Sequence, residues 1–373
     1  MKSIVNILRI LTGLLFIFSG LIKANDPLGL GYKMDEYFTV WNWHWASPFS
    51  LYLSIGMNVL EIVAGVALLL GWAPKFITRL LLVLMVFFTF LTGYAVLSGK
   101  IKTCGCFGDC VPLQAWQSFV KDLVLTAIIL VLVWKHEFIK AVLPLRANLF
   151  AVLFSTGMVF FGQLNVLKHL PYVDCLPYAA GKNLLQQMDP PPGSIPDSVA
   201  IFYTYRKAGQ NVVFDAMHFP TDFDESSYEY VSREEKVVRK GNAEPAIKDF
   251  ALYNSNKTDT TRQLLQASGK QLLFVAKDFN GYKPEWQELF VKLYTKAREK
   301  SIPFFIVSNQ PGDVEEWFNQ TNHFNIPVLT CDGTVLKTML RSKVGVVALQ
   351  GATVAVKWSD ADMNEAVKWM NGL

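Results

Sequence analysis

Long apolar runs dominate the first 169 residues of the chain, and shorter alternating patterns of apolar and polar residues follow them. A helix needs about 20 mostly apolar residues to span a bilayer. Five runs meet this condition, at residues 4–22, 51–72, 76–97, 115–134 and 147–167. Residues 80–99 and 147–167 contain no Asp, Glu, Lys or Arg, which favours membrane spans over buried helices of a soluble core. The pattern therefore predicts five transmembrane helices.

Charged residues around these spans indicate their orientation. Lys2 and Arg9 precede the apolar residues 10–21 as in a secretory signal, but no cleavage site of small residues follows before Lys23, so we expect a retained anchor. With the N-terminus in the cytoplasm, seven Lys or Arg residues flank the spans inside and five outside. Cytoplasmic loops usually carry this excess of cations. We therefore expect an inner (cytoplasmic) membrane protein whose C-terminal region lies in the periplasm.

The segment between the first two spans, residues 25–48, is predicted to be a loop. Trp41, Trp43 and Trp45 alternate with other residues there. Tryptophan is favoured at the boundary between membrane and water. We expect this loop to lie along the outer membrane surface, and we assign its aromatic residues no ligand role.

The chain after the fifth span predicts a soluble region that contains sheet. Four prolines within residues 189–196 favour an extended spacer, so we place a linker at 170–197. Two β-rich runs on either side of residues 206–210 predict a hairpin within a β-rich segment at 198–267. From 268 to 373, strand and helix patterns alternate, which is typical of an α/β fold.

Charge divides at the same place as hydropathy. Residues 1–169 carry 13 Lys or Arg and 7 Asp or Glu, a net of +6, whereas the remaining residues carry 22 and 24, a net of −2. The overall charge of +4 is thus the excess of cations that flank the membrane segments. This composition excludes a disordered chain, a small disulfide scaffold and a nucleic-acid binder whose basic residues are spread along the whole sequence.

The loop between the third and fourth spans contains three of the five cysteines, Cys104, Cys106 and Cys110. Cys110 could bond either neighbour across a glycine turn, since disulfides need α-carbons about 4.4–6.8 Å apart. A Cys104–Cys106 bridge would be strained, and strained bridges tend to be the labile ones. Cys175 follows the fifth span on the same side and is a conceivable exchange partner, whereas Cys331 is expected to be a buried structural thiol.

Three interpretations of the cysteine loop are open. In the first, one thiol attacks a disulfide and another resolves the mixed disulfide, which is what thiol–disulfide exchange requires. In the second, a static disulfide closes the loop and leaves one spare thiol, because cysteines in an oxidising compartment usually stay paired. The third is a metal site, although zinc normally takes four ligands and no histidine or fourth cysteine lies nearby in sequence.

Glu61 and Asn58 form the most polar position inside a predicted span. They are three residues apart and so share one helical face. An ionisable group at membrane depth usually marks a pathway or a partner. Glu61 could accept a proton or position a quinone, and it could equally make a structural hydrogen bond to Ser19 or Thr92.

Three further charged residues lie at the predicted ends of spans. Lys121 and Asp122 open the fourth span, where they could pair near the membrane surface. Lys23 follows the first span and is expected to extend its ammonium group towards the interface. No phosphate loop, Ser-His-Asp spacing or metalloprotease helix is present in the sequence.

Two sequence motifs carry a resemblance to known families. Residues 12–23, Thr-Gly-Leu-Leu-Phe-Ile-Phe-Ser-Gly-Leu-Ile-Lys, resemble the opening of DoxX-type membrane proteins, and Cys104-Gly-Cys106 followed by Phe-Gly resembles the cysteine motif of the MauE branch. The resemblance covers about residues 1–140 and implies a four-helix membrane bundle with thiol–disulfide or quinone-linked redox chemistry. It places the redox pair on Cys104 and Cys106 and leaves 141–169 as an extra fifth span. Cys110 is an addition to the family motif, and we take it as the candidate resolver.

Residues 268–373 resemble a thioredoxin-like domain. Such domains place Cys-x-x-Cys after their first strand, but residues 277–282 read Lys-Asp-Phe-Asn-Gly-Tyr. Val344 stands near the usual cis-proline position. The resemblance therefore implies a degenerate domain used for docking. A DoxX-like bundle with a thioredoxin-like tail resembles a Bacteroidota-type arrangement.

These observations lead to two expectations about function. The first is a membrane thiol–disulfide oxidoreductase or disulfide-maturation factor that acts on the periplasmic face, with a membrane quinone or a thiol protein as its redox partner. The alternative is a non-enzymatic envelope scaffold or docking protein whose cysteine loop is held by a static disulfide. A transporter, suggested by Glu61, is a weaker interpretation because no internal repeat is visible. The expected partners are the lipid bilayer and another envelope protein, without nucleic acid.

Overall fold

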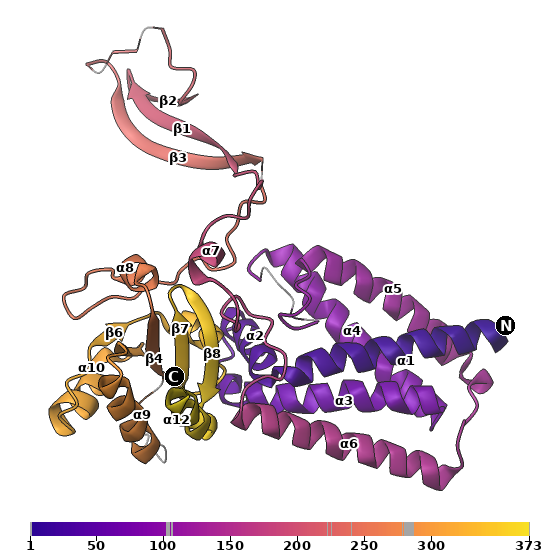
Figure 1. The fold of residues 1–373 in the computed structure, drawn as a ribbon. Helices are drawn as coiled ribbons and strands as arrows, with labels where there is room; N and C mark the ends of the chain where they lie inside the picture. The colour runs from indigo at the N-terminus through magenta and orange to yellow at the C-terminus, as the bar shows by residue number, and fades with distance from the viewer. Residues whose placement is uncertain are drawn as a thin grey trace.

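The computed structural model describes residues 2–372 except 102–104, 106, 222, 225, 240, 278 and 280–286. Figure 1 shows three parts: a bundle of long helices, an α/β unit at one end of that bundle, and a thin sheet that extends away from both.

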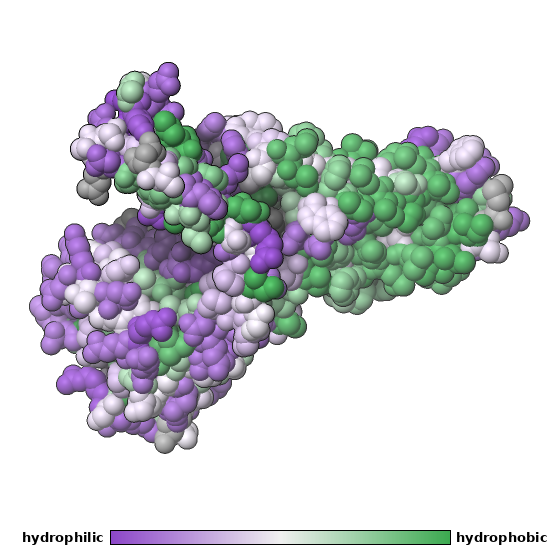
Figure 2. Space-filling view, turned by 90° about the horizontal axis from the view of Figure 1, so that it is seen from above, coloured by the Kyte–Doolittle hydropathy of each residue, from purple (hydrophilic) through white to green (hydrophobic). Residues whose placement is uncertain are grey.

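The bundle contains the five helices that the apolar runs predict. Each is long and apolar enough to cross a membrane. Their bounds are α1 Lys2–Asn25, α3 Ser50–Leu70, α4 Pro74–Ser98, α5 Ala115–Trp134 and α6 Leu145–Lys168. Figure 2 shows apolar side chains covering the outside of the bundle, while polar side chains cover much of the rest. An apolar outer surface is stable in lipid and not in water, so the bundle fits a multi-pass membrane protein.

Small residues let α1 and α3 approach closely. A Cβ atom added at Gly65 would lie 2.8 Å from the Gly13 carbonyl oxygen, so neither position has room for a larger side chain. Close contact through small residues is a common way for membrane helices to associate. Arg9 strengthens the same pair, because its Nε donates to the Leu68 carbonyl oxygen at 2.9 Å near the end of α3.

The predicted loop at residues 25–48 is largely helical in the structure. Its main element is α2, Pro27–Val40, followed by the short 3₁₀ helix η1, His44–Phe49. Asp26 begins α2, because its carboxylate accepts a hydrogen bond from the Gly29 backbone nitrogen at 2.9 Å, and Pro27 occupies the first helical position. The expectation of an irregular loop was wrong because this start signal outweighed the absence of a long apolar run.

The α/β unit is built on a five-stranded sheet in the order β6-β5-β4-β7-β8. β4, β5 and β6 are parallel, β7 is antiparallel to β4, and β8 is antiparallel to β7. The strands are β4 Lys270–Ala276, β5 Phe304–Ser308, β6 Val328–Thr330, β7 Val344–Gln350 and β8 Thr353–Ser359. β4 and β7 are almost entirely buried, as expected for strands that are covered on both faces.

Helices cover both faces of this sheet. One face packs against α9 (Gln287–Glu299), α12 (Met363–Asn371) and the turn formed by α10 (Pro311–Glu315) and the π-helical η3 (Glu316–Thr321), with Phe274, Phe290 and Phe318 fully buried. The opposite face packs against α7 (Leu184–Met188), α8 (Thr261–Gln266) and α11 (Gly333–Met339). The sheet is thus the middle layer of three.

Parts of the predicted linker and β-rich segment also belong to the α/β unit. Leu184 of α7 is fully buried, and its backbone nitrogen donates to the Ala352 carbonyl oxygen at 2.8 Å. Leu252 and Leu265 lie in the same core. The segment after the fifth span is therefore packed along the sheet over part of its length.

The extending sheet consists of β1 (Ser198–Lys207), β2 (Gln210–Asp215) and β3 (Glu229–Arg239), with β1 in the centre. We call it the arm. β1 and β2 form the hairpin that the sequence predicts, and Ala208 and Gly209 at its turn both have positive φ. β3 is exposed along its whole length.

Arg341 connects the α/β unit to the bundle. Its Nε lies 2.8 Å from an Asp26 carboxylate oxygen, and its Nη2 lies 2.9 Å from one of Asp109. The Arg341 side chain is only 6% exposed. His169, at the end of α6, makes a second contact between the two parts, with its Nδ1 atom 2.7 Å from an Asp362 carboxylate oxygen.

We predict that Arg341→Ala weakens this connection. Two carboxylates lose a charged hydrogen-bond donor, which should lower the stability of the contact between the bundle and the α/β unit by about 1.5–3 kcal/mol. The loss should appear as faster amide hydrogen exchange in α11 and α2 of the full-length protein. Arg262→Ala is the matched control, because Arg262 pairs with Asp189 at 3.8 Å and both side chains are more than 60% exposed. Equal exchange rates in the two variants would contradict the prediction.

Candidate functional site

The cysteine loop connects α4 to α5 at the end of the bundle that faces the α/β unit. Two glycines shape it, because Gly105 and Gly108 both have positive φ and the Gly108 backbone nitrogen donates to the Gly105 carbonyl oxygen at 3.0 Å. Cys104 and Cys106, the predicted redox pair, lie outside the described residues. Gly105 between them is described, and it lies against the Lys33 side chain of α2.

Cys110 forms a disulfide with Cys175, and their α-carbons are 4.9 Å apart. The bond joins the cysteine loop to the segment that follows α6, across 65 residues of sequence. It is not the bridge to Cys104 or Cys106 that the sequence suggested, because the end of α6 brings Cys175 directly over the loop. The Cys175 residue is exposed, whereas Cys110 is half-buried.

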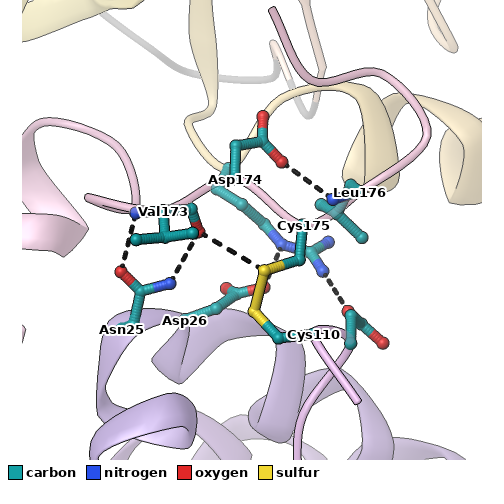
Figure 3. Close-up of a disulfide and its surroundings, with 9 residues drawn as sticks. Asn25, Asp26, Cys110, Val173, Asp174, Cys175 and Leu176 are labelled. Atoms are coloured by element: carbon teal, nitrogen blue, oxygen red, sulfur yellow. Dashed lines mark hydrogen bonds and ion pairs between the residues drawn. A yellow bond between two sulfur atoms is a disulfide. The ribbon is translucent and has the colours of Figure 1, made fainter. Parts of the chain in front are cut away.

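Backbone and side-chain hydrogen bonds hold the Cys175 segment against the end of α1 (Figure 3). Asn25 accepts from the Val173 backbone nitrogen at 3.0 Å and donates to the Val173 carbonyl oxygen at 2.7 Å. Asp174 accepts from the Leu176 backbone nitrogen at 3.0 Å and also pairs with Lys357. The position of Cys175 is therefore fixed from both the bundle and the α/β unit.

The loop also packs on the bundle through Phe107. The Phe107 ring lies 6.1 Å from the Phe18 ring, and the Lys121 ammonium lies 5.1 Å from its centroid. A Cβ atom added at Gly108 would lie 3.3 Å from a side-chain carbon of Ile22. The loop is thus supported by α1 and α5.

A mainly apolar cavity of about 210 Å³ opens beside Gly105. We call it the aromatic cavity. Aromatic and aliphatic side chains form most of its wall, with two lysines and one threonine as polar members. Its lining residues are Lys23, Leu30, Lys33, Met34, Tyr37, Phe38, Trp41, Leu53, Met57, Phe87, Phe88, Leu91, Thr92 and Gly105.

Glu61 pairs with Lys23 inside the bundle, and both side chains are almost fully buried, at 1% and 3% exposed. The expectation that Lys23 reaches the interface was wrong, because the Glu61 carboxylate holds its ammonium group between α1 and α3. Of the two structural partners considered for Glu61, Ser19 is the one that bonds to it, with its hydroxyl 3.3 Å from the carboxylate. Lys23 also lines the aromatic cavity, so this ion pair stands at the cavity wall.

Asn58 has a different partner from Glu61. Its Nδ2 donates to the Gln163 side-chain oxygen at 2.9 Å, which joins α3 to α6. Asn58 and Glu61 share one face of α3, but Asn58 connects α3 to α6, whereas Glu61 connects α3 to α1.

Lys121 and Asp122 pair at 2.5 Å, but not as a surface pair. Asp122 is 1% exposed and lies two turns inside α5, where the Thr92 hydroxyl donates to it at 3.1 Å. Thr92 was also considered as a partner of Glu61, but its hydroxyl bonds to Asp122 instead. A cavity of about 30 Å³ touches both the Lys121–Asp122 and Lys23–Glu61 pairs, which is room for one or two water molecules.

Cys331 is buried in the core of the α/β unit, as expected for a structural thiol. Burial, together with the nearby Asp332 carboxylate, raises the pKa of the Cys331 thiol to about 12. A thiol with this pKa is protonated at neutral pH and is a poor nucleophile. Within the described part of the chain, no group of three or more His, Cys, Asp or Glu residues could hold a metal ion.

The bundle also has a likeness among known protein families. Residues 1–135 match the family model described as methylamine utilisation protein MauE. The MauE-like region therefore covers α1 to α5 and the cysteine loop. A second model, a domain of unknown function (DUF8463), matches residues 199–240, which form the arm. No curated protein and no solved structure matches the chain.

We predict that Cys331 does not react with a maleimide at pH 8 while the protein is folded. Its raised pKa leaves about a thousandfold less thiolate than an ordinary thiol has, and burial blocks access. After unfolding in denaturant, Cys331 should react fully, which mass spectrometry of the labelled peptide measures. Labelling of the folded protein at the rate of an exposed thiol would contradict this prediction.

Proposed function

We propose that this protein is a membrane thiol–disulfide oxidoreductase that oxidises dithiols at its outer face. The observation that carries the proposal is the Cys110–Cys175 disulfide, which lies on the same loop as the Cys-Gly-Cys sequence. Four cysteines then form two pairs, and electrons pass from one pair to the other. The match to the MauE model supports a membrane accessory role of this kind.

The exchange steps balance in thiols and electrons. A substrate thiolate attacks one sulfur of the Cys110–Cys175 bond, and a second substrate thiol resolves the mixed disulfide, so the substrate loses two electrons and both cysteines become thiols. A Cys104–Cys106 disulfide then reoxidises them through a second exchange. Cys110 is four residues from Cys106 in the sequence, so the chain between them can span at most about 14 Å.

The reduced Cys104–Cys106 pair requires an electron acceptor, and the aromatic cavity fits a membrane quinone. A quinone that accepts two electrons and two protons becomes a hydroquinone. The Tyr37, Trp41 and Phe88 rings suit a flat apolar ring, and the Lys23 ammonium offers a hydrogen-bond donor at the wall. Glu61 would keep the Lys23 ammonium at this wall. Gly105, which stands between the two cysteines in the sequence, lines the same cavity.

The compartment follows from the chemistry of the cysteines. Stable disulfides form in oxidising compartments such as the bacterial periplasm. We therefore propose that the α/β unit and the cysteine loop face the periplasm, with the bundle in the inner membrane. The excess of cations on the opposite side supports this orientation.

The α/β unit would act as a docking domain of thioredoxin-like ancestry. Its parallel β4–β5 pair, followed by the β7–β8 hairpin and a last helix, supports that relationship. Residues 277–282, directly after β4, contain no cysteine, and Lys277 instead donates through its Nζ to the Leu340 carbonyl oxygen at 2.8 Å. The unit would therefore contribute binding surface, and the cysteine loop and the segment after α6 would contribute the thiols.

A scaffold role is the second candidate. The Cys110–Cys175 bond and the Arg341 ion pairs hold the bundle and the α/β unit together, which is also what a static envelope scaffold needs. In that case the disulfide would never be exchanged.

We predict that Cys106→Ser prevents reoxidation of Cys110 and Cys175 in cells. After a pulse of membrane-permeant reductant and its removal, the wild-type protein should re-form the Cys110–Cys175 bond, whereas the variant should keep both thiols. Alkylation with a mass-shifting maleimide measures the two states. Cys331→Ser is the control and should recover as the wild type does. Recovery of Cys106→Ser at the wild-type rate would favour the scaffold.

A further inference from the structure

A polar groove of about 480 Å³ lies between the bundle and the α/β unit. We call it the junction groove. One wall is α2, which contributes Gly29, Tyr32, Lys33, Asp35, Glu36, Thr39 and Val40, and the other is α11 with its end, which contributes Thr334, Lys337, Thr338 and Arg341.

The lining of the junction groove includes a neighbour of each bonded cysteine. Asp109 precedes Cys110 in the chain, and Leu176 follows Cys175. Because consecutive α-carbons are about 3.8 Å apart, both cysteines lie within one residue of the groove. Exposed Cys175 is the more accessible of the two. A ligand in the groove would therefore lie next to the disulfide.

A neighbouring groove does not have this property. It has a volume of about 600 Å³ and also touches Arg341, and its other lining residues include Leu28, Lys343, Asp360 and Ala361. None of the residues that line it is adjacent to a cysteine in the sequence. Size alone would favour this second groove, so proximity to the disulfide is what distinguishes the junction groove.

The chemistry of the junction groove fits a polypeptide. Its walls carry hydroxyl groups on Thr39, Thr334 and Thr338 and charges of both signs, so they can pair with backbone N–H and C=O groups. The α2 wall from Gly29 to Val40 is about 16 Å long at 1.5 Å per residue. About five residues of extended chain cover that length at 3.3 Å each. Charges of both signs along the groove disfavour the hydrocarbon chain of a lipid.

We propose that the junction groove is the docking site for an extended, cysteine-bearing segment of another polypeptide, and this inference rests on the proposed function. The groove holds the segment across α2 and α11 with its cysteine over Cys175. The substrate thiolate attacks the Cys175 sulfur and forms a mixed disulfide, and Cys110 leaves as a thiolate. A second substrate cysteine then attacks the mixed disulfide, which releases an oxidised substrate and the Cys175 thiol.

The test measures how fast the Cys110–Cys175 bond is reduced in the full-length protein in nanodiscs. Three thiol probes are compared: reduced, unfolded ribonuclease A as the polypeptide, glutathione, and dithiothreitol. Thr39→Trp and Thr334→Trp fill the groove from its two walls at exposed positions. Ala361→Trp is the matched control, since Ala361 is exposed and lines the neighbouring groove. Alkylation and mass spectrometry report the free thiols.

Both groove variants should slow reduction by the ribonuclease about tenfold, a loss that corresponds to about 1.4 kcal/mol, and should leave reduction by dithiothreitol unchanged. Ala361→Trp should react with all three probes as the wild type does. Unchanged rates with the ribonuclease in both groove variants would overturn the docking site while the relay stands. Equal slowing with glutathione would overturn the polypeptide as the ligand. A disulfide that only dithiothreitol reduces would overturn this inference, and the Cys106→Ser experiment would then decide the proposed function separately.

Discussion

The arrangement of the whole molecule depends on the ion pairs between Arg341 and two aspartates of the bundle. Asp26 has two tasks, because one of its oxygens begins α2 and the other accepts from Arg341 Nε at 2.8 Å. Asp109 binds the same guanidinium and is the residue before Cys110. A single buried arginine therefore fixes the start of α2, the cysteine loop and the α/β unit relative to one another. The disulfide adds a covalent bond at the same place.

This junction separates two environments on either side of the cysteine loop. The aromatic cavity lies on the side of the bundle, with a wall that is almost entirely apolar, and the junction groove lies on the polar side between α2 and α11. A small pocket lies between the aromatic cavity and the junction groove, and its lining includes Asp26, Lys33, Gly105 and Asp109. Lys33, Gly105 and Asp109 also line the cavity or the groove. Asp26 and Asp109 bind Arg341. The Cys110–Cys175 disulfide therefore belongs to a loop that has an apolar cavity on one side and a groove with charges of both signs on the other.

Apolar patterning predicted the parts of the fold that depend on local sequence. The five spans follow from runs of about 20 apolar residues, and the arm hairpin follows from its β-rich runs and Gly209. The Ser19–Glu61 bond could be anticipated because a buried carboxylate needs a donor. Asp26 and Pro27 are a local signal for the start of α2, and the prediction of a loop overlooked this signal.

Long-range pairings could not be read from the sequence in the same way. Lys23 and Glu61 are 38 residues apart, and only the close glycine packing of α1 against α3 brings them together. Cys110 and Cys175 are 65 residues apart, and their meeting depends on where α6 ends. Nothing in the composition of Arg341 and its neighbours indicates that its partners lie in the membrane half.

The most direct test of the central claim is a single turnover with an added quinone. The full-length protein in nanodiscs is reduced, the reductant is removed, and a fully substituted benzoquinone with a short isoprenoid tail is added, since such a ring cannot add a thiol. Hydroquinone should form in step with the loss of thiols at Cys110 and Cys175, and Cys104→Ser should abolish both changes. Loss of those thiols without hydroquinone, or thiols that persist in the presence of the quinone, would contradict it.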